Sequence, residues 1–178
     1  LVSFNADDPV QPASLTKLMT SYVIADYIKE GFINLNDTPK ISIKAWKTEG
    51  SRMFIREGTK VPVAELIKGM IIQSGNDASV ALAEHAAGSE ENFVYLMNEY
   101  ASELGMLNSN FNNASGLPDP LNVTSAEVTF KGSGKPDALL KLEFNMPSSD
   151  AYSFIKYTKF SSLPAACSAS ATLASFPD

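Results

Sequence analysis

Ser14 and Lys17 have the residue types and the spacing of an activated serine and its base. Residues three apart on a helix lie on one face, so the amine of Lys17 can reach the hydroxyl of Ser14. A serine hydroxyl becomes an effective nucleophile when a neighbouring base removes its proton. Lysine can be that base if burial lowers its pKa, and the apolar residues Leu18, Met19 and Val23 can form a buried wall. The pair indicates nucleophilic catalysis.

A structural interpretation of the same pair is also open. Short patterns of serine and lysine occur by chance, and Ser14 would then be a helix N-cap with Lys17 solvated in the first turn. Pro12 is a helix-entry signal under either interpretation. The two interpretations differ in whether Lys17 is buried.

A second polar group lies between two predicted helices. Apolar spacing predicts a helix that ends before Gly75 and another that begins near Asp77. Ser74 and Asn76 therefore lie at the tip of a tight turn, where a hydroxyl and an amide can both point into a cleft. Such residues are also common in turns for conformational reasons alone.

Together these motifs resemble those of the low-molecular-mass D-alanyl-D-alanine carboxypeptidases, serine peptidases of the penicillin-binding protein 5 type. Penicillin-recognising serine enzymes combine Ser-x-x-Lys, Ser-x-Asn and Lys-Thr-Gly. The first two are present in the expected order. The resemblance covers roughly Leu1 to Pro120 and includes the segments Met53–Gly58, Gly69–Ala78 and Ser115–Leu117.

The resemblance implies a role for each site residue. Ser14 would attack the carbonyl between the last two D-alanines of a peptidoglycan stem peptide, with Lys17 as its general base. Ser74 would relay a proton to the leaving group. Asn76 would bind the substrate amide and hold Lys17, and Gly75 would contribute to substrate binding. The backbone N–H of Ser14 would be one of two oxyanion-hole donors.

The third motif of the family does not occur in the sequence. Neither Lys-Thr-Gly nor Lys-Ser-Gly is present, and Lys131-Gly132-Ser133-Gly134 is interpreted as a glycine-rich turn. An active serine carboxypeptidase is the favoured function. The alternative is a non-catalytic binder of peptidoglycan or β-lactams, or a truncated domain, without a second oxyanion donor. A β-lactamase is disfavoured, because no Glu-x-x-x-Asn segment follows Ser74.

Periodicity and capping signals predict helices over about 14–30, 62–73, 77–87 and 90–104. The last helix has Ser89 as its N-cap, and acidic side chains occupy its first turn. Lys40 to Lys44 alternates as a short exposed strand would, with a polar connection after it, and 139–146 predicts another strand.

The resemblance implies an α/β (α+β) transpeptidase fold, in which a helical subdomain accompanies an antiparallel sheet flanked by helices. The first strands of that sheet are expected to be missing. We therefore expect 1–178 to be one partial catalytic domain, with 1–120 similar to the family and 121–178 divergent.

Composition excludes several other classes of protein. A chain of 178 residues with 44% hydrophobic content suffices for one well-packed domain. A net charge of −6 without a basic stripe argues against a nucleic-acid partner. The single Cys167 excludes an internal disulfide and a cysteine-based metal cluster, and the single His85 is expected to be a partly buried structural residue. No cofactor is expected.

Partners and localisation follow from the resemblance. It implies a peptidoglycan pentapeptide ending in D-Ala-D-Ala as substrate and β-lactam antibiotics as covalent inhibitors. It also implies an extracytoplasmic location, in the periplasm or cell envelope of a bacterium. The sequence shows no signal peptide and no apolar run of transmembrane length, so any membrane anchor would lie outside these residues.

Overall fold

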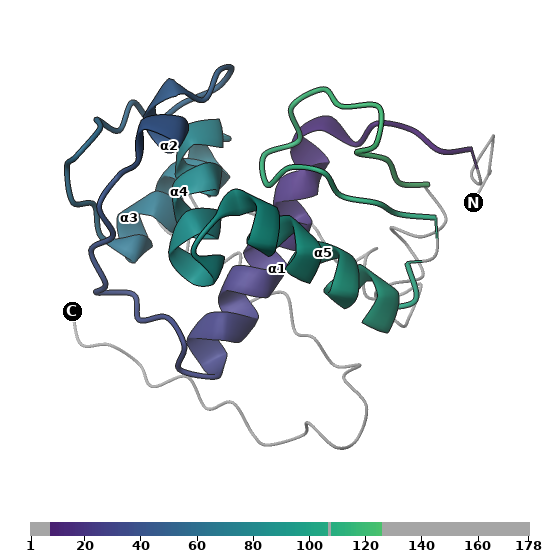
Figure 1. Ribbon diagram of the computed structural model, residues 1–178, viewed down its shortest axis with the longest axis horizontal. Helices are drawn as coiled ribbons and strands as arrows, with labels where there is room; N and C mark the ends of the chain where they lie inside the picture. The colour runs from purple at the N-terminus through teal and green to yellow at the C-terminus, as the bar shows by residue number, and fades with distance from the viewer. Residues whose placement is uncertain (1–7, 107, 126–178) are drawn as a thin grey trace.

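Helices form the framework of the protein (Figure 1). The computed structural model describes residues 8–106 and 108–125 of the chain. The longer helices are α1 (Thr16–Lys29), α3 (Val63–Ile72), α4 (Asn76–Ala87) and α5 (Glu90–Glu103), and the shorter ones are the 3₁₀ helix η1 (Ala13–Leu15) and α2 (Ile43–Lys47). The four predicted helices are thereby confirmed.

α4 is the central helix, because it packs against α1, α2, α3 and α5. Its first eight residues, Asn76 to Ala83, are all buried. A helix that is buried on every side needs small or apolar side chains, and alanine dominates this one. The loop that precedes α4 is therefore fixed by a helix that contacts most of the described structure.

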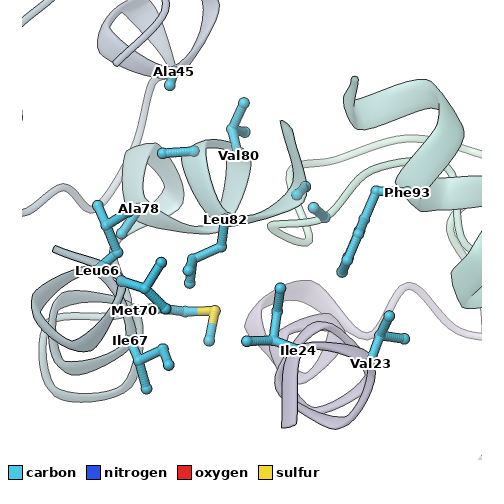
Figure 2. Close-up of a cluster of buried hydrophobic side chains, with 14 of the residues drawn as sticks. Val23, Ile24, Ala45, Leu66, Ile67, Met70, Ala78, Val80, Leu82 and Phe93 are labelled. Atoms are coloured by element: carbon cyan, nitrogen blue, oxygen red, sulfur yellow. The ribbon is translucent and has the colours of Figure 1, made fainter. Parts of the chain in front are cut away.

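The hydrophobic core lies between α1, α3, α4 and α5 (Figure 2). Each of these helices contributes side chains that are almost fully buried: Val23, Ile24, Leu66, Met70, Leu82, Phe93 and Met97. This core holds α1 against α4, and so fixes the start of α1 relative to the start of α4.

The junction between α4 and α5 follows the predicted capping. α4 ends at Gly88, whose φ of +80° is the left-handed conformation that glycine adopts without strain. Ser89 then caps α5, since its Oγ accepts a hydrogen bond of 3.1 Å from the backbone N–H of Asn92. The prediction of Ser89 as an N-cap is confirmed.

The exposed strand predicted at Lys40–Lys44 is wrong. The segment forms only a single antiparallel bridge to Lys60 before α2 begins. Ser42 is an N-cap, and its Oγ accepts a hydrogen bond of 2.9 Å from the N–H of Ala45. Of its five residues only Ile41 is buried, so the segment is mostly exposed but is not a strand. The cap at Ser42 favours a helix over the strand that the alternating pattern predicts. The polar connection predicted after this segment is largely helical, because α2 continues to Lys47.

The described residues leave the predicted sheet untested. Their β-pairing consists of isolated bridges: Val10 with Thr124, Lys40 with Lys60, and Asn110 with Val123. The first of these joins the segment before η1 to the end of the described chain. The strand predicted over 139–146, the string 131–134 and Cys167 lie outside the described residues.

None of the helices in the described segments has the length and apolar character needed to cross a bilayer.

The core makes a prediction about stability. Replacing Phe93, which is fully buried, by alanine should lower the free energy of unfolding by about 3–5 kcal/mol, because the change removes apolar contacts and leaves a cavity. Tyr95 lies on the same helix but is 65% exposed, so Tyr95→Ala should change it by no more than about 0.5 kcal/mol. Urea denaturation of both variants measures the difference, and equal losses would contradict this description of the core.

Candidate active site

Ser14 and Lys17 lie at the entrance to α1, as the sequence predicts. Ser14 is the central residue of η1, and Lys17 is in the first turn of α1. The Lys17 Nζ is 3.3 Å from the Ser14 Oγ. The helix-capping interpretation is wrong, because no side chain caps α1 and Lys17 is only 6% exposed.

The Lys17 amine is held by neutral acceptors. Its Nζ donates hydrogen bonds to the Asn76 Oδ1 (2.7 Å) and to the backbone oxygen of Ser115 (2.6 Å). Within the described segments no carboxylate forms an ion pair with it. Burial therefore acts without a compensating negative charge and lowers the pKa of Lys17 to about 8. At pH 7 about a tenth of such an amine is unprotonated and able to accept a proton.

Ser74 completes the group around the Ser14 hydroxyl. Its Oγ donates a hydrogen bond of 3.0 Å to the Ser14 Oγ. Its backbone has a φ of +52°, in the left-handed region that is uncommon for a residue with a Cβ. A residue in such a conformation persists where the surrounding structure holds it, and such residues cluster at functional sites. Three polar side chains, those of Ser14, Lys17 and Ser74, thus meet at one place.

The amide of Asn76 is fixed at both ends. Its Oδ1 accepts from Lys17, and its Nδ2 donates to the backbone oxygen of Glu49 at 2.7 Å. The Asn76 N–H also donates to the backbone oxygen of Ser51. Gly50 lies between them, and a Cβ there would be 2.5 Å from the Asn76 Nδ2, so only glycine allows this close approach. The segment 49–51 thereby orients the Asn76 oxygen toward Lys17.

Gly75 separates Ser74 from Asn76, and its N–H is used within the protein. It donates to the backbone oxygen of Gly69 at 3.1 Å. A Cβ at Gly75 would lie 3.1 Å from the same oxygen and from the Asp77 Oδ1. Gly75 therefore allows the turn to lie closely against α3.

The loop at Ser115 and Gly116 lies against both Lys17 and the residue before Ser14. The motifs do not include a side chain that makes these contacts. The backbone oxygen of Ser115 binds Lys17. Gly116, with a φ of +83°, lies so close to the carbonyl group of Ala13 that a Cβ would overlap it. The contact to Lys17 uses a backbone atom, which has no sequence signature. Besides the resemblance of Ser115–Leu117 to the family, the physical signal in the sequence was the glycine, because a positive φ and a close approach both favour that residue.

His85 lies apart from this hydrogen-bond group. Its side chain is 25% exposed, as predicted for a partly buried residue, and its Nε2 is 3.3 Å from the Asp37 Oδ2. In the described part of the chain no cluster of three or more His, Cys, Asp or Glu residues could hold a metal ion.

The same arrangement of helices occurs in solved penicillin-binding proteins. Penicillin binding protein 5 from Haemophilus influenzae has a TM-score of 0.72 and 41% identity over 80% of this chain and 42% of that chain. The D-alanyl-D-alanine carboxypeptidase DacD from Francisella tularensis has a TM-score of 0.71 and 41% identity over 75% of this chain and 32% of that chain. The helical structure therefore belongs to the fold class of the penicillin-binding proteins.

The family model for D-alanyl-D-alanine carboxypeptidase matches residues 1–130, and the chain belongs to this family. It is 48% identical to D-alanyl-D-alanine carboxypeptidase DacC of Escherichia coli K12 over 126 residues, which are 67% of this chain and 32% of the relative. It is 42% identical to DacF of Bacillus subtilis over 126 residues, 71% of this chain and 32% of that relative. The chain spans about a third of the length of the curated relatives it matches. The resemblance identified from the motifs is confirmed.

The buried amine predicts a pH dependence of stability. The pKa of Lys17 falls from 10.5 to about 8 on folding, so between these values the unfolded chain holds a proton that the folded chain has released. The unfolded state then binds more protons, and stability rises with pH. Relative to Lys17→Met, the free energy of unfolding of the wild type should rise by up to about 3 kcal/mol between pH 7 and 10.5.

Urea denaturation across this pH range measures the divergence between the two proteins. The control is Lys29→Met, which removes a lysine from an exposed position on the same helix. An equal divergence of Lys29→Met would show that burial of Lys17 is not the cause. A constant difference between wild type and Lys17→Met would show that the lysine pKa is not lowered.

Proposed function

We propose that this chain carries the catalytic serine of a serine-type D-Ala-D-Ala carboxypeptidase, which trims peptidoglycan stem peptides. The observation that carries the proposal is the buried Lys17 amine 3.3 Å from the Ser14 Oγ, with the Ser74 hydroxyl 3.0 Å from the same oxygen. A serine with an adjacent base is the arrangement that activates a hydroxyl for acyl transfer, and the second hydroxyl at hydrogen-bond distance can relay a proton.

Acylation would begin with unprotonated Lys17. Its amine takes the proton of Ser14 while the Oγ attacks the carbonyl carbon of the penultimate D-alanine. The Ser14 N–H is proposed as one oxyanion donor, and the second would come from outside the described residues. When the tetrahedral intermediate breaks down, the C–N bond is cleaved and a proton passes from Lys17 through the Ser74 hydroxyl to the departing nitrogen. D-Alanine leaves, and the rest of the peptide is an ester on Ser14.

Deacylation would use the same groups with water as the nucleophile. Lys17, unprotonated again, takes a proton from water as the oxygen attacks the ester carbon. The ester C–O bond then breaks, and the proton returns to the Ser14 oxygen. One peptide bond is hydrolysed for each water consumed. In this cycle Asn76 has the proposed roles of holding Lys17 and binding the substrate amide, and Gly75 shapes the loop beside the substrate.

The proposal extends to inhibitors, location and domain organisation. β-Lactams present a strained amide and would acylate Ser14 in the same way. The substrate is a cell-wall peptide, so the protein would act outside the cytoplasm, in the periplasm or cell envelope. Residues 1–178 would form one partial catalytic domain with 121–178 divergent, although the family match continues to residue 130.

Covalent labelling tests the proposed nucleophile. Incubation with benzylpenicillin should add one penicilloyl group per chain, located by peptide mapping on Ser14, and Ser14→Ala should gain none. A tripeptide ending in D-Ala-D-Ala should release D-alanine, whereas the diastereomer ending in L-alanine should be inert.

Two results would contradict the carboxypeptidase. Tight binding of penicillin by folded protein without an adduct would favour a non-catalytic binder. Hydrolysis of many equivalents of a chromogenic cephalosporin would indicate a β-lactamase.

The packing of Gly116 predicts a specific loss of acylation. Gly116→Ala forces the added Cβ against the carbonyl group of Ala13 and so displaces the adjoining Ser14. A displacement of about 1 Å at a reacting group can cost about 100-fold in rate, and we expect a loss of this size in the rate of acylation by penicillin. The matched control is Gly88→Ala. Gly88 has a similar φ of +80° but no atom within 4 Å of an added Cβ, so this variant should be less stable yet acylated normally. Equal rates for the two variants would contradict the prediction.

A further inference from the structure

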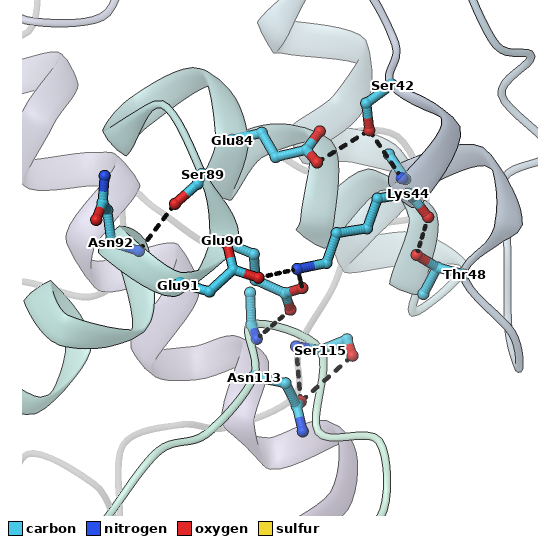
Figure 3. Close-up of polar contacts among 12 residues, drawn as sticks. Ser42, Lys44, Thr48, Glu84, Ser89, Glu90, Glu91, Asn92, Asn113 and Ser115 are labelled. Atoms are coloured by element: carbon cyan, nitrogen blue, oxygen red, sulfur yellow. Dashed lines mark hydrogen bonds and ion pairs between the residues drawn. The ribbon is translucent and has the colours of Figure 1, made fainter.

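A buried carboxylate holds the loop that binds Lys17 (Figure 3). Glu90, the first residue of α5, is 8% exposed. Its Oε1 accepts a hydrogen bond of 3.0 Å from the backbone N–H of Ala114, and its Oε2 is 2.9 Å from the Lys44 Nζ. Burial of a carboxylate is unfavourable unless it is paired and hydrogen-bonded, and Glu90 has both partners. The proposed reaction described above does not use this group.

The hydrogen bond from Ala114 is one of two that hold this residue. The backbone oxygen of Ala114 accepts from the Thr20 Oγ1 at 2.7 Å. Thr20 is on α1, one turn after Lys17, whereas Glu90 is on α5. The backbone of Ala114 is thus held from one side by the helix of the base and from the other by α5.

The next peptide group transmits this position to the amine. The N–H of Gly116 donates to the Asn113 Oδ1 at 2.6 Å, while the oxygen of the same peptide group, that of Ser115, accepts from the Lys17 Nζ at 2.6 Å. Hydrogen bonds at the two ends of one peptide group polarise each other, so this oxygen is a strong and directed acceptor. Ala114 directly precedes Ser115, so the backbone conformation at Ala114 affects the direction of the Ser115 oxygen relative to Lys17.

We propose that Glu90 is a positioning residue for Lys17: its carboxylate fixes the backbone at Ala114 and thereby places the Ser115 oxygen that orients the amine toward Ser14. The inference rests on the proposed function and names a residue that supports the base of that reaction. Glu90 itself touches neither the substrate nor Ser14.

A merely structural role would have a different signature. A carboxylate in the first turn stabilises any helix through its interaction with the helix dipole. Glu91 occupies the same turn and also pairs with Lys44, at 2.6 Å, but its side chain is 74% exposed, and within the described segments its ion pair is to Lys44 and not to the loop. Glu91 is therefore the matched control for helix charge and for the contact to Lys44.

The experiment measures acylation of the full chain by a chromogenic cephalosporin in stopped flow. Varying the cephalosporin concentration separates the non-covalent dissociation constant from the acylation rate constant, and the amplitude gives the fraction of active sites. Glu90→Ala leaves the buried Ala114 N–H without its acceptor, so we expect the acylation rate constant per active site to fall about tenfold or more. The dissociation constant should remain within about twofold.

Rescue by a conservative variant separates geometry from charge. Glu90→Gln retains an oxygen that can accept from Ala114, and Lys44 keeps its pair with Glu91, so acylation should remain within about threefold of the wild type. Glu91→Ala should be acylated at the rate of the wild type.

Each other outcome overturns the inference. If Glu90→Ala lowers only the melting temperature or the fraction of active sites, with a normal rate constant per active site, its role is structural. If acylation of Glu91→Ala is equally slow, the loss of rate comes from the helix charge. If Glu90→Gln is acylated as slowly as Glu90→Ala, the hydrogen bond to Ala114 is not the cause of the loss. If the wild type is not acylated at all, the proposed function fails and the inference with it. Normal acylation of both wild type and Glu90→Ala refutes the inference alone.

Discussion

The structure of the site depends on burying the amine of Lys17 among neutral oxygens. A carboxylate beside this amine would keep it protonated, whereas full exposure to water would leave its pKa near the ordinary value. The acceptors on Asn76 and Ser115 orient the amine without a negative charge, and burial lowers its pKa to about 8. The segment 49–51 holds the Asn76 oxygen in place, and Asn113 holds the peptide group that carries the Ser115 oxygen.

The scaffold brings these oxygens together from distant parts of the chain. α4 contacts four other helices, so its first residue, Asn76, and Ser74 in the turn before it have fixed positions relative to α1. The loop around Ser115 lies against the start of α1, and Figure 1 shows this green segment beside the purple N-terminal part. Glycines at 50 and 116 permit these close approaches, because a side chain at either position would meet a neighbouring residue.

Much of this site follows from the sequence, and the rest does not for identifiable reasons. The longer helices and the meeting of Ser14, Lys17, Ser74 and Asn76 were predictable, because apolar periodicity and side-chain chemistry both leave a pattern. The Ser115 contact was not, since every residue has a backbone oxygen and only tertiary packing selects one. The strand predicted at 40–44 failed because a local cap overrode alternation. The sheet implied by the family lies beyond what the described residues test.

The direction of the hydrogen bonds at Ser14 has a consequence for the resting protein. The Oγ receives hydrogens from both Lys17 and Ser74. While the Lys17 amine is protonated, it has no lone pair to accept the hydroxyl hydrogen of Ser14. That hydrogen must then point away from the amine. Loss of one proton from Lys17 frees a lone pair, and the bond between the two residues can reverse, with Ser14 becoming the donor. Ser14 then receives a hydrogen from Ser74 and donates its own to Lys17, so the charge on the lysine decides whether the hydrogen bonds converge on Ser14 or run through it toward Lys17.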